Sequence, residues 1–259
     1  MSGGRDAGFG DHFSAQAPDY ARYRPGYPGE LFRHLAEVAP ARDTAWDCGT
    51  GSGQAALPLA AHFAHVIATD ASERQLQQAS PHPRVSYRVA RAEDSGLPDD
   101  SVDLVTVAQA LHWFDRDRFY REARRVLRPG GVLAAWTYLL AQVDAAIDAE
   151  LASFHADVLG PFWPPERVHV DRGYADLDFP FEPLTAPALE MTGQWDLAHY
   201  LAYLGTWSAV RRYREARGED PVAQWMAPRV RALWGEPERR RTVRWPLRLL
   251  VGCTRRNIG

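Results

Sequence analysis

A glycine-rich turn followed at a distance by an acid constrains this chain more than any other feature of its sequence. Residues 45–53 read Ala-Trp-Asp-Cys-Gly-Thr-Gly-Ser-Gly, and Asp70 closes the next apolar run. Glycines in such a turn take positive φ angles and let a ligand come close to the backbone. A strand, a turn of this kind and an acid about twenty residues later predict a doubly wound α/β sheet that binds an adenosine cofactor, with the acid on the ribose hydroxyls.

The spacing of the glycines indicates which adenosine compound is bound. Gly49, Gly51 and Gly53 are spaced Gly-x-Gly-x-Gly, whereas a dinucleotide fingerprint is Gly-x-Gly-x-x-Gly. Asp47 stands directly before them, where an acid would repel a pyrophosphate. The same acid suits a ligand that carries a positive ammonium group, and S-adenosylmethionine has one.

Composition excludes several classes of protein. The 259 residues carry a net charge of −3, which argues against a nucleic-acid partner. We expect the arginine clusters at 121–128 and 239–244 to be solvated faces. No apolar run is long enough to span a membrane, and the two cysteines form no metal-ligand pattern. The sequence contains no lysine, which excludes a Schiff-base lysine. We expect a cytoplasmic protein with no metal site.

Strands alternate with helices through the first half of the chain, which predicts a parallel sheet with right-handed crossovers. We expect a helix from about Ser52, kinked or shifted by Pro58, and a second helix capped by Ser72 with Gln75 three residues on. Asp115 is expected to cap a further helix, which ends at Arg128-Pro-Gly-Gly131. The strands are expected at residues 44–47, 65–69, 84–90, 102–108 and 132–137.

The pattern changes after residue 137. Residues 141–159 predict an amphipathic helix, and two or three further helices fit within 196–234. An alternating segment near the C-terminus predicts a final strand. Because proline cannot donate to a sheet ladder, we expect that strand to begin at or after Pro246.

These motifs resemble those of the class I S-adenosylmethionine-dependent methyltransferases. The resemblance covers residues 44–136 and includes the glycine turn, Asp70, Ala92-Glu93, Asp99 to Asp103 and Arg128-Pro-Gly-Gly131. A finer similarity points to the trans-aconitate and small-molecule branch of that family. It rests on Tyr20-Ala-Arg-Tyr-Arg-Pro-Gly-Tyr-Pro28, Ala110 to Asp115, Gly173-Tyr174, Asp178 to Phe181 and Thr206-Trp-Ser208.

The resemblance implies an architecture. We expect a doubly wound, mostly parallel, seven-stranded sheet with a helical lid inserted after the fifth strand, all within one domain, residues 1–259. Residues 1–30 would cover the cofactor and 31–137 would form the cofactor-binding core. Residues 138–240 would form a mainly helical lid over the substrate, and 241–259 the final strand.

The resemblance also assigns site residues. Asp47 would hold the methionine end of S-adenosylmethionine, Asp70 the ribose, and Ala71, Ala92 and Glu93 the adenine. The full set of expected cofactor-binding residues is Tyr20, Asp47, Gly49, Thr50, Gly51, Gly53, Asp70, Ala71, Ala92, Glu93, Gln109 and Ala110. The expected substrate-binding residues are Tyr23, Arg24, His112, Trp113, Tyr174 and Trp207. His112 is also the candidate general base. Arg91, where many relatives carry an acid, departs from the pattern.

Together the sequence predicts methyl transfer to a small-molecule acceptor by in-line displacement, with S-adenosylhomocysteine as product. A carboxylate oxygen, a hydroxyl and a ring nitrogen are all open as the acceptor atom. Two alternatives remain: a non-catalytic protein that binds S-adenosylmethionine, and a nicotinamide-dependent oxidoreductase. Either a monomer or a homodimer fits the sequence.

Overall fold

A computed structural model describes residues 25–255 of the chain. Within this range the strands form an eight-stranded sheet in the order β3-β2-β1-β4-β5-β8-β6, with β7 paired to β8. The strands are β1 (Thr44–Cys48), β2 (His65–Asp70), β3 (Val85–Val89), β4 (Val102–Ala108), β5 (Leu127–Tyr138), β6 (Glu182–Pro183), β7 (Glu190–Trp195) and β8 (Arg241–Cys253). Strands β1 to β5 are parallel, and β8 runs antiparallel to β5, β6 and β7. The predicted doubly wound, mostly parallel sheet is confirmed.

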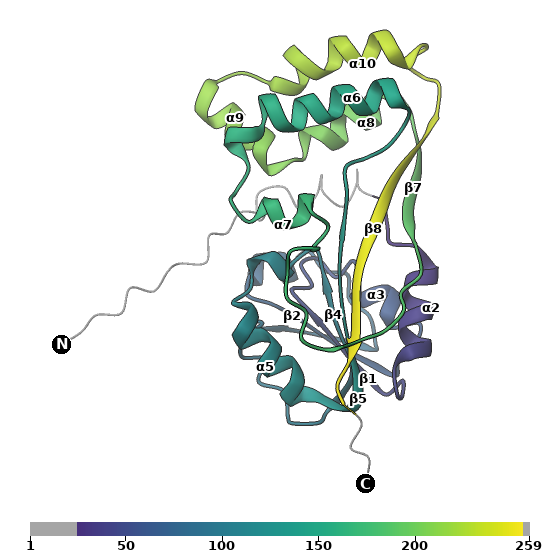
Figure 1. The fold of residues 1–259 in the computed structure, drawn as a ribbon, viewed down its shortest axis with the longest axis vertical. Helices are drawn as coiled ribbons and strands as arrows, with labels where there is room; N and C mark the ends of the chain where they lie inside the picture. Colours follow the sequence, from purple (N-terminus) through teal and green to yellow (C-terminus); the bar gives the residue numbers. More distant parts are fainter. Residues whose placement is uncertain (1–24, 256–259) are drawn as a thin grey trace, which may run out of the picture.

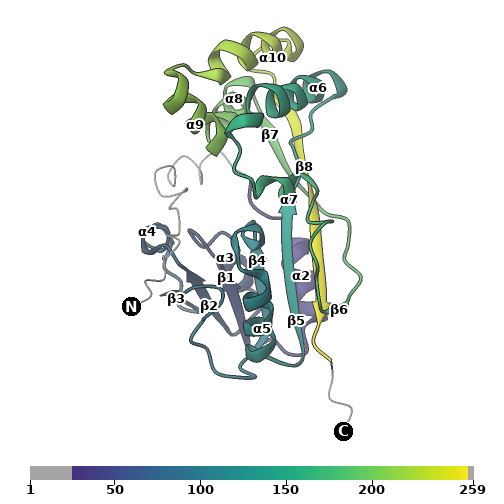
Figure 2. The same cartoon turned by 60° about the vertical axis from the view of Figure 1, so that its left-hand side comes forward.

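Helices cover both faces of the sheet, and more helices lie beyond the carboxyl ends of its parallel strands (Figures 1 and 2). Helix α5 lies on one face and α2 and α3 on the other; α6, α8, α9 and α10 gather at the far end. The α-helices are α2 (Gly29–Val38), α3 (Ala56–Leu59), α4 (Glu73–Leu76), α5 (Arg116–Val126), α6 (Ala145–Ser153), α7 (Arg167–Asp171), α8 (Leu197–Gly205), α9 (Ser208–Arg217) and α10 (Ala227–Trp234). Short 3₁₀ or π turns occupy Leu111–Trp113, Phe154–Val158, Gly160–Phe162 and Val222–Met226.

The centre of the sheet is buried on both faces because parallel strands carry helices on each side. Six of the seven residues of β4 are buried. Helix α5 covers one face with Phe119, Ala123 and Val126, and its first turn is capped by Asp115, whose carboxylate accepts the backbone N–H of Arg118. These features place β4 and the start of α5 where the sequence predicts them.

Helices α3 and α4 differ from the sequence-based expectation. The helix expected from Ser52 begins at Ala56 and ends at Leu59, so Pro58 coincides with a shortened helix. The side chain of Ser72 makes no capping bond to α4. The backbone N–H of Ser72 instead donates to Asp70, so this helix start is tied to the end of β2 by an acid.

The final strand also differs, because β8 begins at Arg241 and passes through Pro246. The carbonyl of Pro246 accepts the N–H of Leu139, one residue after β5 ends at Tyr138. Pro246 therefore lies where the pairing between β5 and β8 stops. The backbone N–H that proline lacks costs little stability at this position. Before that point β8 pairs with β7, and after it with β5 and β6.

The segment after β5 is not purely helical. The helix expected over 141–159 spans Ala145–Ser153 and continues as a π turn over Phe154–Val158. Strands β6 and β7 come from the same part of the chain and add to the sheet edge, which brings the described strands to eight instead of seven. No helix between residues 25 and 255 combines the length and the apolar character that crossing a bilayer requires.

Candidate functional site

The glycine turn lies at the carboxyl end of β1, the edge at which open α/β sheets bind ligands. Gly49, Gly51 and Gly53 have φ angles of +68°, +56° and +85°. A Cβ on Gly49 would lie 2.8 Å from the Cβ of Ala110, and one on Gly53 would lie 2.6 Å from Oη of Tyr87. A Cβ on Gly51 would lie 3.9 Å from Oε1 of Gln75, an ordinary van der Waals contact. A side chain at Gly49 or Gly53 would therefore be crowded, whereas one at Gly51 would not.

Asp47 is fully buried beneath this turn. Its Oδ2 accepts a 2.5 Å hydrogen bond from the hydroxyl of Thr50, and its Oδ1 accepts a 2.8 Å bond from Thr106 on β4. Burial raises the pKa of Asp47 to about 6, and the two threonine hydrogen bonds offset part of that effect. The carboxylate therefore holds the glycine turn against β4. Its contact with the methionine end of a cofactor stays a prediction.

Asp70, at the end of β2, binds the same turn from the other side. Its Oδ2 accepts the backbone N–H of Gly51 at 2.8 Å, and its Oδ1 accepts that of Ser72 at 2.8 Å. Asp70 therefore ties the glycine turn to the start of α4. The neighbouring Ala71 is partly exposed.

Two of the residues predicted to contact adenine, Ala92 and Glu93, lie beyond β3. Ala92 is 8% exposed, and the side chain of Glu93 is 9% exposed. The Oε1 of Glu93 accepts the backbone N–H of Asp115 at 3.0 Å, so this acid also positions the start of α5. Arg91 is largely exposed and lies 3.5 Å from Glu93.

The turn after β4 contains a strained residue. Gln109 has a φ of +60°, a left-handed conformation that costs about 1–3 kcal/mol where it is held at functional sites. Its Oε1 accepts the hydroxyl of Thr137 at 3.0 Å. Its amide nitrogen is buried and has no hydrogen-bond partner within residues 25–255. A buried donor without an acceptor is costly, so this nitrogen favours a ligand that accepts a hydrogen bond.

His112 follows in the same turn and is joined to a residue far along the chain. Its Nδ1 lies 2.9 Å from Oη of Tyr174, which also carries a positive φ of +63°. Burial lowers the pKa of His112 to about 3, with the charge of Arg167 as the second cause. Burial likewise raises the pKa of the Tyr174 phenol. The imidazole is therefore neutral at physiological pH.

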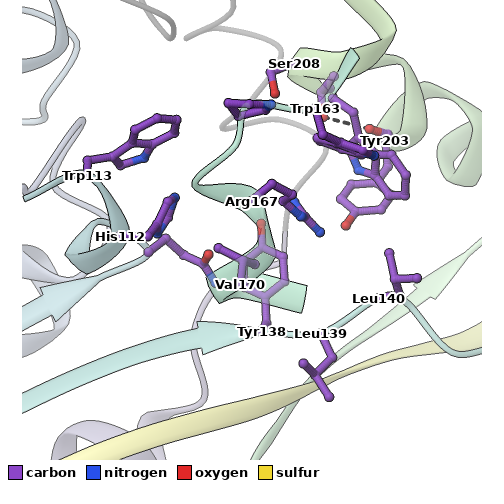
Figure 3. Close-up of a pocket in the computed structure, with 14 residues that line it drawn as sticks. His112, Trp113, Tyr138, Leu139, Leu140, Trp163, Arg167, Val170, Tyr203 and Ser208 are labelled. Atoms are coloured by element: carbon purple, nitrogen blue, oxygen red, sulfur yellow. Dashed lines mark hydrogen bonds between the residues drawn. The ribbon is translucent and has the colours of Figure 1, made fainter. Parts of the chain in front are cut away.

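A pocket with aromatic walls opens beside this turn (Figure 3). About 780 Å³ of space free of protein atoms lies within it, open solvent included. We call it the aromatic pocket. Its lining is Gln109, His112, Trp113, Tyr138, Leu139, Leu140, Trp163, Pro164, Arg167, Val170, Tyr203, Thr206, Trp207 and Ser208.

The structure brings most of the predicted site residues to one end of the sheet. Gln109, His112, Trp113 and Trp207 line the aromatic pocket. Tyr174 is fully buried behind His112 and does not line the pocket. Three predicted residues lie outside the described range, Tyr20, Tyr23 and Arg24.

Several functional residues escaped sequence reasoning. Thr106 and Thr137 look like ordinary strand residues, and nothing in their spacing marks them as partners of Asp47 and Gln109. Arg167 follows Pro-Pro-Glu in an irregular stretch without a recognisable motif. No group of three or more His, Cys, Asp or Glu side chains in the described part of the chain is placed to hold a metal ion.

Comparison with known proteins adds independent evidence. Residues 46–135 match a family model described as "Methyltransferase domain". A "Putative methyltransferase" of Dictyostelium discoideum is 34% identical over 220 residues, which cover 83% of this chain and 84% of that protein. A "Probable S-adenosylmethionine-dependent methyltransferase" of Saccharomyces cerevisiae is 28% identical over 133 residues, 48% of this chain and 46% of that one.

A solved structure extends the similarity to nearly the whole chain. It is titled "The Structure of a Putative Type II Methyltransferase from Anaeromyxobacter dehalogenans" and is 53% identical. The match covers 90% of this chain and 99% of the other, with a TM-score of 0.85. The sheet, the glycine turn and the helical segment after β5 therefore have a counterpart in one solved protein.

Proposed function

Because this chain belongs to the class I S-adenosylmethionine-dependent methyltransferases, we propose that it methylates a small molecule bound in the aromatic pocket. One observation carries the proposal: the turn after β4 contacts the glycine turn and also lines the pocket. Ala110 packs against Gly49, and its neighbour Gln109 lines the pocket. A cofactor held by the glycine turn would face an acceptor held in the pocket.

The residues around the glycine turn fit the cofactor. Gly51 has no side chain, so a ligand can approach its backbone closely. Asp70 lies at the end of β2, beside the glycine turn, and we assign it to the two ribose hydroxyls. Ala71, Ala92 and Glu93 are assigned to the adenine side. We assign Asp47 to the methionine end, where its carboxylate attracts the ammonium group.

S-adenosylmethionine supplies a methyl group on a positively charged sulfur, which an acceptor atom takes by in-line displacement. The task of the protein is alignment, which can supply roughly 7–11 kcal/mol in favourable cases. Gln109 donates a hydrogen bond into the pocket, and the aromatic walls fix the plane of the acceptor. Trp113 and Trp207 contribute to those walls.

His112 orients the acceptor in this proposal. General-base catalysis works best when the pKa of the base lies near the operating pH. A pKa of about 3 makes the imidazole of His112 a weak base. Its Nδ1 is occupied by Tyr174, so Nε2 is the nitrogen left to contact the acceptor. We therefore assign His112 a hydrogen bond to the acceptor, and Tyr174 the task of holding the imidazole ring.

The segment between residues 138 and 240 supplies the wall that faces the β4 turn. Trp163, Tyr203 and Trp207 come from this segment and lie near one another: the ring centroids of Trp163 and Trp207 are 5.5 Å apart, and those of Tyr203 and Trp207 are 5.9 Å apart. We propose that this segment acts as the substrate lid. Its shape would then select the acceptor.

The alternatives have less support. Because the chain belongs to a methyltransferase family, no observation supports a nicotinamide-dependent oxidoreductase. A non-catalytic protein that binds S-adenosylmethionine would not need a pocket with an unsatisfied amide donor beside its cofactor turn. The orphaned amide nitrogen of Gln109 therefore favours the enzyme.

A turnover experiment tests the proposal. The protein is incubated with methyl-labelled S-adenosylmethionine and a library of small carboxylic acids, phenols and nitrogen heterocycles. We expect label in one class of small product, with an equal amount of S-adenosylhomocysteine. Binding of S-adenosylhomocysteine without turnover on any member would favour the non-catalytic alternative. Label that enters only macromolecules would contradict a small acceptor.

A further inference from the structure

The aromatic pocket contains one guanidinium and, among the described residues that line it, no carboxylate. Arg167 is the first residue of α7, and in Figure 3 its side chain lies between His112 and Tyr203. Its charge is the second cause of the low pKa of His112. The positive field of Arg167 therefore reaches the turn after β4, on the opposite wall.

Two contacts hold the guanidinium of Arg167 in place. Its Nε donates to Oδ1 of Asp171, one helical turn later, at 2.8 Å. Its Cζ lies 4.5 Å from the ring centroid of Trp163, a cation–π distance. The two terminal nitrogens have no hydrogen-bond acceptor within residues 25–255. The guanidinium of Arg167 is held through Nε and through its stacked face. Its two terminal nitrogens, which form the fork of the guanidinium, can therefore donate together to a planar anion.

The other residues that line the pocket restrict further which class of ligand it can bind. Gln109 offers a buried amide donor that also has no acceptor in the described structure. Tyr138, Trp163, Tyr203 and Trp207 give the pocket flat apolar walls. One cation with two free nitrogens matches the two oxygens of a carboxylate. A phosphate dianion carries more charge than this single arginine, already paired with Asp171, can balance.

We propose that Arg167 is the anion-binding residue of the aromatic pocket, and that the pocket takes a planar, conjugated carboxylic acid. The carboxylate pairs with the fork of Arg167, and the ring lies against the tryptophan walls. That this acid is the methyl acceptor rests on the proposed function. The anion site itself rests only on the geometry of Arg167.

Matched probes test the charge. Benzoate and 2-naphthoate are titrated by calorimetry into the protein saturated with S-adenosylhomocysteine, alongside benzamide and 2-naphthamide, which have the same shape without the charge. We expect at least one acid to bind about tenfold or more tightly than its amide, as a charged bidentate hydrogen bond implies.

Matched variants test the residue. Arg167→Gln should remove the preference for the acid and leave the affinity for the amide unchanged. Arg167→Lys keeps the charge but loses the two paired terminal nitrogens, so it should retain part of the preference for the acid. Arg229→Gln is the control, because Arg229 also stacks on a tryptophan, Trp225 at 4.1 Å, and pairs with Glu150 at 3.4 Å, but lies outside the pocket. That variant should behave as wild type.

The outcomes separate this inference from the proposed function. Equal affinity for acid and amide, no binding of either acid, or wild-type binding by the Arg167 variants would overturn the anion site. If the protein fails to bind S-adenosylhomocysteine, the proposed function falls. The same titrations on the unloaded protein then decide the anion site alone, because the preference for the acid must persist there.

Discussion

The phenol of Tyr174 lies 2.9 Å from Nδ1 of His112, and this buried bond joins the segment after β5 to the turn after β4. Tyr174 has a φ of +63° and follows Gly173 at +61°. Gln109, in the turn after β4, has a similar φ of +60°. Strained residues of this kind persist only where the surrounding structure enforces them, and they cluster at functional sites.

The first prediction concerns this bond. Tyr174→Phe should lower the free energy of unfolding by about 1–3 kcal/mol, because it leaves a buried ring nitrogen without its partner. Methyl transfer should fall, while affinity for S-adenosylhomocysteine stays unchanged. Tyr120→Phe is the matched control, since that phenol donates to the carbonyl of Asp178 at 2.8 Å, away from the pocket. Urea unfolding and turnover rates measure both effects. Equal turnover in the two variants would make Tyr174 a packing residue.

Asp47→Asn should separate stability from cofactor binding. The pKa of Asp47 is about 6 in the folded chain and 3.8 in the unfolded chain. Between these values the folded state keeps a proton that the unfolded state releases, so wild-type stability falls as the pH rises through this window. Asparagine has no such proton. The variant should therefore gain about 1–3 kcal/mol relative to wild type between pH 4 and pH 8.

The same substitution should weaken binding of S-adenosylhomocysteine, because it removes the negative charge beside the ammonium group. Urea unfolding at several pH values and calorimetry provide the two measurements. A stability difference that does not vary with pH would show that the carboxyl is not protonated on folding. Unchanged affinity would remove Asp47 from the cofactor site.

Two glycine substitutions should act differently. In Gly49→Ala the new methyl group would lie 2.8 Å from the Cβ of Ala110, in addition to the strain of a positive φ. In Gly51→Ala it would lie 3.9 Å from Oε1 of Gln75, an ordinary van der Waals contact. We expect Gly49→Ala to lose more stability, and Gly51→Ala to lose mainly affinity for S-adenosylhomocysteine. Thermal unfolding and calorimetry compare them. A larger stability loss in Gly51→Ala would contradict this placement of the ligand.

Asp70→Ala should weaken binding of S-adenosylhomocysteine by about 1–3 kcal/mol through the lost ribose hydrogen bonds. Because Asp70 also accepts the N–H groups of Gly51 and Ser72, some stability should be lost as well. Asp99→Ala is a suitable control, since Asp99 is largely exposed and pairs with Arg125 at the surface. Calorimetry on both variants measures the difference. Equal affinities would place Asp70 outside the site.

Local patterns in the sequence predicted the sheet well. Strand β4 spans Val102–Ala108 as expected, and Asp115 caps α5, because both depend on neighbouring residues alone. Pro246 misled the prediction of β8. A proline argues against a central strand, but here it falls where the partner strand ends, and only the pairing of distant segments shows that.

The positions of the glycine turn, Asp47 and Asp70 were predicted for a similar reason. They lie within one strand–turn–helix unit and the strand that follows, and their contact with the cofactor stays a prediction. The contacts on the proposed acceptor side were harder to predict, because Arg167 and Tyr174 lie more than fifty residues along the chain from the turn after β4. The partners of Asp47 and Gln109, Thr106 and Thr137, face them across neighbouring strands. Such pairs depend on sheet register, which no local motif encodes.

Calorimetric titration of the wild-type protein with S-adenosylhomocysteine, with NAD as the control ligand, tests the central claim most directly. The geometry of Gly51, Asp47 and Asp70 predicts one site per chain, with micromolar or tighter affinity for S-adenosylhomocysteine and no measurable affinity for NAD. Absence of binding, or a preference for NAD, would contradict the assignment of the glycine turn and the function built on it.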